Sequence, residues 1–463
     1  MSFDQLPPEI VDRIFDFLPP DRQRAFSTVL LRWHLRVAWK AVLSLSYLAV
    51  RYGGQTEELT NATRRYRNFK ISSLRSQSDF DLLRDLVQIS SERYTVHKFC
   101  FEFVTCDFFE QMVREFQDWF STAVVLKIQL NDNERFPSEV LSSFKFVQEL
   151  HLNNLSDSAA DWSCVWDSMK ALRSLTAYMC WNFSDAALEC FIASVCKKCK
   201  LLKGFTIFAT DCINVSPIAK SLINLEKLAL VGMMVALEPS TLVFPALREL
   251  HLDLEIFQSD EIYLSLDAPK LDYLRIPKKN IPHIHFSNST KFTRLTTYGD
   301  CMETPYPWFL ETEELKTTIH EPSNQEAILT EMNLFPKMAR LAVKIMSKEC
   351  TTHVPSACTF QNIRSLYINN FILSMNFFVQ IAEMKLLERF IIEECNFLLD
   401  VHNTGLLDLS QLHHYRVKRV SMPRTVTVFP VIASGQPPIV LVDRLRTHLW
   451  RDDFYNVFSS QWD

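Results

Sequence analysis

The chain has 463 residues, of which 48% are hydrophobic and 22% charged, and its formal net charge is −5 at pH 7. This composition is typical of a globular protein with a large core, and the length exceeds that of one typical domain. The lack of a basic excess argues against sequence-independent nucleic-acid binding. No run of about 18 apolar residues occurs, so the sequence predicts no membrane span.

Glycine and cysteine usage narrows the function classes further. Only 7 glycines occur, and neither the GxGxxG nor the GxxxxGK[ST] phosphate-binding pattern is present. The first residues include Asp4 and no apolar run before Pro7, unlike a signal peptide. The 12 cysteines are therefore expected to be reduced thiols, and the sequence predicts a cytoplasmic or nuclear protein.

The stretch from Leu6 to Trp33 reads LPPEIVDRIFDFLPPDRQRAFSTVLLRW and predicts short helices. Pro7 and Pro8 suit a first helical turn, Glu9 suits the positive end of the helix dipole, and apolar residues then recur at helical spacing. A segment of about 40 residues buries too little apolar surface to be stable alone. The surplus of apolar side chains therefore predicts a docking module that needs a partner surface.

The same stretch resembles an F-box, through residue types and spacings that match together. The matching pattern is Leu6-Pro7-x-Glu9-Ile10, Ile14-Phe15-x-Phe17-Leu18, Asp21-Arg22, Val29 and Trp33. The resemblance covers residues 1–45 and implies binding to the Skp adaptor, and through it to a cullin, in an SCF (cullin–RING) ubiquitin ligase. It implies adaptor-contacting or packing roles for Leu6, Pro7, Ile10, Ile14, Phe15, Leu18, Val29 and Trp33. The alternative is an ordinary helical hairpin packed on its own chain.

After a polar connector at residues 46–65, an L-x-x-L-x-L motif with apolar substitutes recurs as far as residue 434. The central residues of successive copies are about 21 to 30 positions apart, except across a stretch before Leu341 in which the motif is unclear, and at a weak last copy. The middle and last apolar residues of successive copies are Phe69/Ile71, Phe99/Phe101, Leu126/Ile128, Leu150/Leu152, Leu175/Ala177, Phe205/Ile207, Leu228/Leu230, Leu250/Leu252, Leu274/Ile276, Leu295/Thr297, Leu341/Val343, Leu366/Ile368, Phe390/Ile392 and Val420/Met422.

A period of this size predicts stacked units, none of which can bury its apolar side alone. In each short strand the middle and last apolar residues are expected to face the core, and the residues before, between and after them to line an open sheet. The pattern resembles an irregular leucine-rich repeat solenoid. This resemblance implies an α/β fold with parallel strands on the concave face and helices or loops on the convex face. Isolated strands in an ordinary α/β fold are the alternative.

Two further features bear on the register of the repeats. The repeat that contains Leu175 and continues through Cys180 to Cys199 resembles the cysteine-containing leucine-rich repeat common in F-box proteins. A shared register is also supported by three dipeptides that precede predicted strands by the same offset: Phe244-Pro245, Ala268-Pro269 and Phe335-Pro336.

Three segments depart from the repeat pattern. Residues 277–290 carry prolines and polar residues and predict a longer loop, and residues 305–333 contain at most a degenerate repeat. The hint of a repeat in the second segment comes from Leu310, Leu315 and Ile319. Residues 435–463 begin with a Gly-Gln-Pro-Pro stop and are expected to form a cap or tail.

Residue types that carry catalysis or bind metals are scattered in this chain. Cys196-Lys197-Lys198-Cys199 is the one CxxC, and with Cys180 and Cys190 nearby it offers enough thiols for zinc. However, Cys180 and Cys199 already have places in the repeat pattern, so core cysteines are the better interpretation. No G-x-S-x-G or H-E-x-x-H pattern occurs. We therefore expect no catalytic residue, no metal site and no cofactor.

The outward positions of the predicted strands are the candidates for binding. Tyrosine and arginine are favoured at binding hot spots, which singles out Tyr273, Arg275, Tyr367 and Arg389 as contacts to a client protein. The other outward residues expected on this face include Glu149, His151, Glu249, His251, Asp253 and Arg419. The alternative is that any of them is an ordinary solvated strand residue.

The combined interpretation is a substrate-recognition subunit of an SCF ubiquitin ligase. Its F-box would bind the adaptor, and its repeats would hold a client protein that the sequence does not identify. A leucine-rich repeat scaffold without a ligase role is the alternative, and an enzyme built on cysteines and histidines is a third class with only scattered residues behind it. Nucleic acid and membranes are not expected partners.

Overall fold

The computed structural model describes residues 47–50, 68–72, 77–93, 96–130, 137–155, 162–180, 183–233, 241–255, 264–287, 289–320, 325–346, 353–354, 362–374, 377, 380–381, 384–393, 395–398 and 414–418. The predicted F-box at 1–45, with its adaptor-binding residues, and the predicted cap or tail at 435–463 lie outside these ranges. The described residues fall into two compact units, with the boundary between Ala187 and Leu188.

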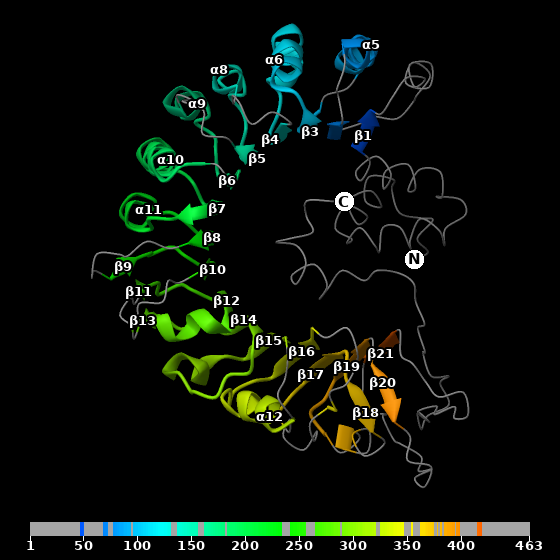
Figure 1. Ribbon diagram of the computed structural model, residues 1–463, viewed down its shortest axis with the longest axis vertical. Helices are drawn as coiled ribbons and strands as arrows, with labels where there is room; N and C mark the ends of the chain where they lie inside the picture. The colour runs from blue at the N-terminus through cyan, green and yellow to red at the C-terminus, as the bar shows by residue number, and fades with distance from the viewer. Residues whose placement is uncertain are drawn as a thin grey trace, which may run out of the picture. The chain divides into compact units, whose positions relative to one another are not determined.

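The described part of the first unit contains six parallel strands that pair in chain order. They are β1 (Tyr47–Val50), β2 (Asn68–Ser72), β3 (Lys98–Val104), β4 (Val125–Leu130), β5 (Glu149–Leu155) and β6 (Ser174–Met179). Helices cover one side of this sheet (Figure 1): α5 (Gln77–Arg93), α6 (Cys106–Glu115), α7 (Gln117–Phe120), α8 (Ser138–Leu141) and α9 (Trp162–Ser168). β1 lies within the segment predicted as a connector and extends the sheet by pairing with β2.

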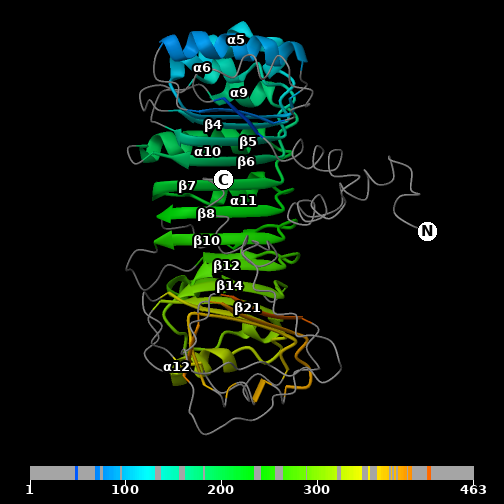
Figure 2. The same ribbon diagram turned by 90° about the vertical axis from the view of Figure 1, so that its right-hand side faces the viewer.

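The described part of the second unit contains ten parallel strands in one sheet, again in chain order, and Figure 2 shows β7 to β14 of this sheet side by side. They are β7 (Gly204–Cys212), β8 (Lys227–Met233), β10 (Glu249–Glu255), β12 (Tyr273–Pro277), β14 (Arg294–Gly299), β15 (Glu314–Ile319), β16 (Arg340–Ile345), β17 (Ser365–Asn369), β19 (Arg389–Glu393) and β21 (His414–Lys418).

Shorter elements lie on one side of this second sheet (Figure 1). The helices are α10 (Asp185–Lys198), α11 (Ser216–Ser221), α12 (Gln325–Asn333) and the 3-10 helices η2 (Lys278–His283) and η3 (Pro307–Glu311). Two small parallel sheets join β9 (Leu242–Val243), β11 (Leu264–Asp267) and β13 (Ile284–Phe286), and β18 (Ile372–Ser374) with β20 (Asn396–Leu398). Among the described helices of the chain, none is long and apolar enough to cross a membrane.

The apolar residues of the motif line up from strand to strand, which confirms the predicted leucine-rich repeat fold. In the first unit Phe99 pairs with Leu126, and Leu126 with Leu150. In the second unit Leu228 pairs with Leu250, and the same register continues strand by strand. All five of these side chains are at most 2% exposed. Because the same position of each copy faces the interior, neighbouring copies bury one another.

A tight turn before several of the strands explains the first apolar position of the motif. The N–H of this residue donates to the carbonyl oxygen three residues earlier, from Leu247 to Phe244 (3.4 Å) and from Leu271 to Ala268 (3.0 Å). Proline directly follows Phe244 and Ala268, where it suits the second position of such a turn. These dipeptides therefore mark the register, as the sequence predicted.

Residues 305–333, predicted to contain at most a degenerate repeat, contain a complete strand of the main sheet, β15. It pairs with β14 and β16, with Leu315 in the middle apolar position and Thr317 in the last. Thr297 holds the same last position in β14 and pairs with Thr317. Both threonines are fully buried, so two adjacent repeats bury hydroxyl groups where most other copies bury aliphatic side chains.

A buried ion pair lies next to Thr317. Lys278 of η2 donates from Nζ to Oε2 of Glu331 in α12 (2.7 Å), and the two side chains are 3% and 0% exposed. Glu331 also accepts from Thr317 Oγ1 at Oε1 (3.0 Å) and from the N–H of Met302 at Oε2 (3.2 Å). Residues 277–290, predicted as a longer loop, instead contain η2 and β13 and contribute the lysine that pairs with this carboxylate.

The last described strand corrects the register predicted for the final copy. β21 pairs Tyr415 with Phe390 and Val417 with Ile392 of β19. Val417 therefore takes the last position of the motif and not the first, so the copy centred on Val420 is wrong. The error has a simple cause, because Leu412-x-x-Tyr415-x-Val417 fits the same motif with tyrosine in the middle position.

We expect Glu331→Ala to destabilise the second unit strongly, because it leaves the buried ammonium group of Lys278 without its partner. Removing one side of a buried ion pair typically costs about 3–5 kcal/mol. Denaturant unfolding of the full chain, followed by circular dichroism, measures the change.

The matched control is Glu311→Ala, whose carboxylate meets Lys337 at the surface (2.8 Å) and is expected to contribute little. Equal shifts of the unfolding midpoint for Glu331→Ala and Glu311→Ala would contradict the expectation.

Candidate functional site: the outward face of the strands

Alternation along each strand divides its side chains between two sides of the sheet. In β4 and β6 every second residue is buried, as expected for a strand with one side on the core. The first, third and fifth residues of each strand lie on the other side, which we call the outward face. The four residues predicted to contact a client all occupy such positions.

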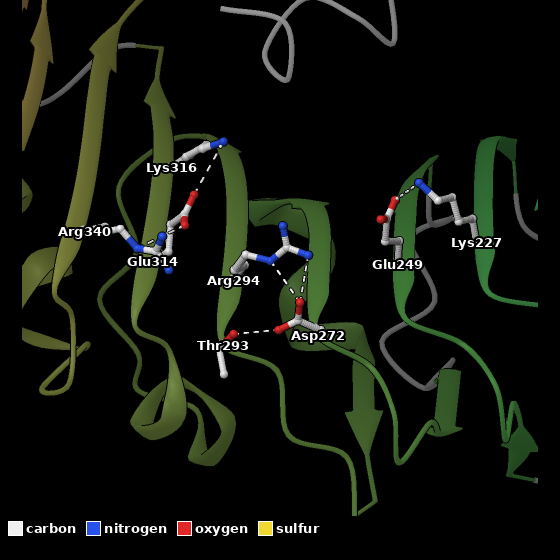
Figure 3. A network of polar contacts seen from close by, with 8 residues as sticks. All are labelled: Lys227, Glu249, Asp272, Thr293, Arg294, Glu314, Lys316 and Arg340. Carbon is white, nitrogen blue, oxygen red and sulfur yellow. Dashed lines mark hydrogen bonds and ion pairs between the residues drawn. The ribbon is translucent and has the colours of Figure 1, made fainter. Parts of the chain in front are cut away.

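In the second unit, the first residues of successive strands form a row across the outward face. The row runs Lys227, Glu249, Tyr273, Arg294, Glu314, Arg340, Ser365 and Arg389. Opposite charges meet between neighbouring strands, Lys227 with Glu249 (2.8 Å) and Arg340 with Glu314 (3.3 Å; Figure 3). Partly exposed pairs of this kind contribute about 1 kcal/mol or less, so their main effect is to neutralise charge on this face.

A second set of contacts joins the starts of β12 and β14 (Figure 3). Arg294 donates to Oδ2 of Asp272 through Nη2 (2.7 Å) and Nε (3.1 Å), and Thr293 Oγ1 donates to Oδ1 (2.7 Å). The Thr293 hydrogen bond, and then the Arg294 charge, hold the pKa of Asp272 below its usual value. The Arg294 guanidinium also lies 5.3 Å from the centroid of the Tyr273 ring. Asp272 is therefore an ionised, fully engaged carboxylate and unsuited to acid–base catalysis.

The predicted contacts Tyr273 and Arg275 lie within an internal network on β12. Tyr273 donates to Thr296 Oγ1 (3.1 Å), and the Arg275 guanidinium lies 5.8 Å from the centroid of the Tyr298 ring. Burial and a hydrogen bond to Asp253 raise the pKa of Tyr298. Arg275 is only 9% exposed, so little of its side chain is available to a partner.

The other two predicted contacts lie on β17 and β19. Tyr367 is partly exposed, and its hydroxyl oxygen accepts a hydrogen bond from Nδ2 of Asn369 (3.2 Å). Arg389 is also partly exposed and forms no ion pair with any residue that the structure describes. β14, β15 and β16 lie between β12 and β17, so the four predicted residues form two separate pairs.

In the first unit the outward face holds a small hollow of about 50 Å³. The charged and titratable residues that line it are Cys100, Glu102, Lys127, His151 and Tyr178. Glu102 pairs with Lys70 (2.7 Å), and a hydrogen bond joins His151 Nε2 to Oε1 of Glu149 (2.5 Å). A hollow of this size admits water-sized groups and is far smaller than a small-molecule site.

The cysteines of the CxxC segment show no arrangement suited to chemistry. Cys180, Cys196 and Cys199 are buried whereas Cys190 is exposed. Burial raises the pKa of the Cys196 thiol to about 11, and a thiol acts as a nucleophile or metal ligand only when it is ionised. Within the described residues, no group of three or more His, Cys, Asp or Glu side chains could hold a metal ion.

The chain is similar, at low sequence identity, to solved structures of other proteins. No protein-family profile matches the chain, and no curated protein matches it either. An internalin from Listeria monocytogenes is 14% identical, with a TM-score of 0.33, covering 82% of this chain and 94% of its own. The leucine-rich repeat domain of APL1B is 9% identical, with a TM-score of 0.25, covering 66% of this chain and 72% of its own. The leucine-rich repeat assignment itself rests on the strand register described above.

We expect the stability of the chain to fall as the pH drops below about 6.5, in part through His151. Burial lowers the pKa of His151, although the Glu149 hydrogen bond opposes this effect. The folded state therefore holds a neutral ring at pH values where the unfolded chain, with a histidine pKa of about 6.5, takes up a proton. The contribution of His151 to the free energy of unfolding is complete above the histidine pKa of the unfolded chain. It is lost as the pH falls from there toward the lower pKa of His151 in the folded state.

His151→Gln removes this titration, so its free energy of unfolding is expected to change less than that of the wild type between about pH 7.5 and 5.5. Denaturant unfolding at several pH values measures the difference. His285→Gln, at an exposed position of β13, is the control. An unchanged pH dependence in His151→Gln would contradict the expectation.

Proposed function

We propose that this chain is the substrate-recognition subunit of an SCF (cullin–RING) ubiquitin ligase. The observation that carries the proposal is the pattern from Leu6 to Trp33, in which both the residue types and their spacing resemble an F-box. The leucine-rich repeat sheet supports it, because its outward face offers an extended row of polar and aromatic side chains of the kind that stacked repeats use for binding.

The mechanism under this proposal is proximity. The F-box binds the Skp adaptor, which connects to a cullin, and the repeats hold a client protein beside the ubiquitin-charged conjugating enzyme. Fixing both reactants in one assembly raises their effective concentration and orients them. The repeats then need shape and polar complementarity to the client, and the chain needs no acid, base or nucleophile of its own.

A leucine-rich repeat interaction scaffold without a ligase role is the alternative. It shares the outward face as a binding surface and differs in one respect, the role of residues 6–33. In the scaffold these helices pack on the chain itself or bind an adaptor without ubiquitin transfer. The binding partner of the N-terminal segment therefore distinguishes the two functions.

We expect Leu6→Ala combined with Pro7→Ala to abolish adaptor binding while the repeats stay folded. Both residues match adaptor-contacting or packing positions of an F-box, and both precede the first described strand. Affinity capture of the full chain from cells, with quantitative mass spectrometry, should recover Skp and cullin with the wild type and at least about tenfold less with the double variant. Thermal unfolding by circular dichroism checks that the repeats are intact.

Phe146→Ala is the matched control, because it truncates an apolar side chain that is 63% exposed in the repeat region. It should leave adaptor recovery unchanged. Absence of both Skp and cullin from the wild-type capture would contradict the ligase proposal and favour the scaffold.

A further inference from the structure

The hollow on the outward face of β3 to β6 lies wholly within the first unit. We call it the polar hollow, after the polar side chains that line it: Cys100, Glu102, Lys127, Gln129, His151, Asn153 and Tyr178. Residues of its outer row pair from strand to strand, Glu102 with Gln129 and Gln129 with Asn153. Neighbouring repeats therefore build this site together.

Two carboxamides in the polar hollow lack hydrogen-bond partners. The Oδ1 atom of Asn153 is buried and accepts no hydrogen bond. The side-chain amide of Gln129 forms none with any described residue. The two residues lie on paired strands about 4.8 Å apart, yet their amides are not bonded to each other. A buried acceptor without a donor costs free energy, so a group that enters the hollow and donates to Asn153 gains stability there.

The lining of the polar hollow has balanced charge. Among the side chains that line it, Glu102 is the one carboxylate and Lys127 the one ammonium group, and their charges attract each other. The Cys100 thiol is neutral, because burial and the charge of Glu102 raise its pKa to about 12. Burial also lowers the pKa of His151 and favours its neutral ring. The lining therefore supplies no net charge to offset the lost hydration of an ion, which favours a neutral ligand.

A primary carboxamide complements this lining better than other neutral side-chain groups. It carries two N–H donors and a carbonyl acceptor on one planar group, whereas a hydroxyl carries one donor. It can donate to both Asn153 and Gln129, and it complements the Asn153 amide in either orientation of that amide. The volume of about 50 Å³ is room for roughly four water-sized groups, and so for the carbon, oxygen and nitrogen atoms of a carboxamide.

We propose that the polar hollow binds the side-chain carboxamide of an asparagine or glutamine of the client protein. The N–H groups of the ligand donate to Asn153 and Gln129, and its carbonyl oxygen accepts from Lys127. This inference rests on the proposed function, since it names a group of the client that the receptor holds. An acidic side chain fits poorly, because its carboxylate has no donor for the buried Oδ1 of Asn153.

The test is binding of N-acetylglutamine methylamide to the full chain, measured by saturation-transfer NMR. A ligand that fills this hollow alone is expected to have a dissociation constant on the order of millimolar, which this method detects. The matched probes are N-acetylglutamate methylamide and N-acetylmethionine methylamide, which keep the backbone amides and change only the end of the side chain. We expect the glutamine probe to bind at least about fivefold more tightly than either, because it alone donates from its side chain.

Gln129→Met and Asn153→Leu each remove one carboxamide and nearly keep the size of the side chain. Each is expected to weaken binding of the glutamine probe by about fivefold or more. Gln148→Met is the matched control, since Gln148 is an exposed carboxamide directly before β5 that does not line the hollow. It should leave the affinity within about twofold. Circular dichroism of each variant verifies folding.

Three results would overturn the proposal: equal binding of the three probes, equal losses in Gln129→Met and Gln148→Met, or no saturation transfer to the glutamine probe, as expected of a hollow that holds water only. Methyl glucoside, offered as a competitor, tests a neutral ligand of another class. Its displacement of the glutamine probe at a concentration below that of the probe would overturn the proposal in favour of a carbohydrate.

The probe assay contains no adaptor, so it is independent of the capture experiment. Adaptor capture without probe binding overturns this inference alone. Probe binding without adaptor capture overturns the ligase function alone, and leaves the polar hollow as a binding site of the scaffold.

Discussion

The pairing of one apolar residue in each strand with the same residue of the next strand is the contact on which the rest of the structure depends. Leu250, for example, pairs with Leu228 on one side and Leu274 on the other, and all three are at most 2% exposed. A slip of one residue would move every buried side chain to solvent, so this pairing fixes the register of the whole sheet. The outward rows, including Lys227 beside Glu249, are a consequence of the same register.

The register of the repeats could be predicted from the sequence because each copy repeats its apolar positions in the same order. The prediction failed for β15, where Thr317 replaces the aliphatic residue of the motif. The hydroxyl group of Thr317 donates a hydrogen bond to Glu331, which is distant from the motif. The final copy failed for a different reason. Val417 fits two overlapping versions of the pattern, and only the pairing of β21 with β19 decides between them.

The candidate site could be predicted in part. Strand alternation was enough to place Tyr367 and Arg389 on the outward face, but it could not show that Arg275 is covered through its contact with Tyr298 of the next strand. The matched charges are also a property of several repeats at once. Aligning the copies row by row reveals them, whereas each motif taken singly does not. The client's identity depends on a second molecule and is not encoded in these rows.

The most direct test of the account is site-specific photo-crosslinking in cells, since its central claim is that the outward face of the second unit binds a protein. Benzoyl-phenylalanine placed at Tyr367 samples that face, and the same group at Glu189, an exposed position of α10, samples the helix side. The account predicts that one protein is crosslinked from position 367 and is absent from position 189. Crosslinks to the same protein from position 189, with none from position 367, would contradict it.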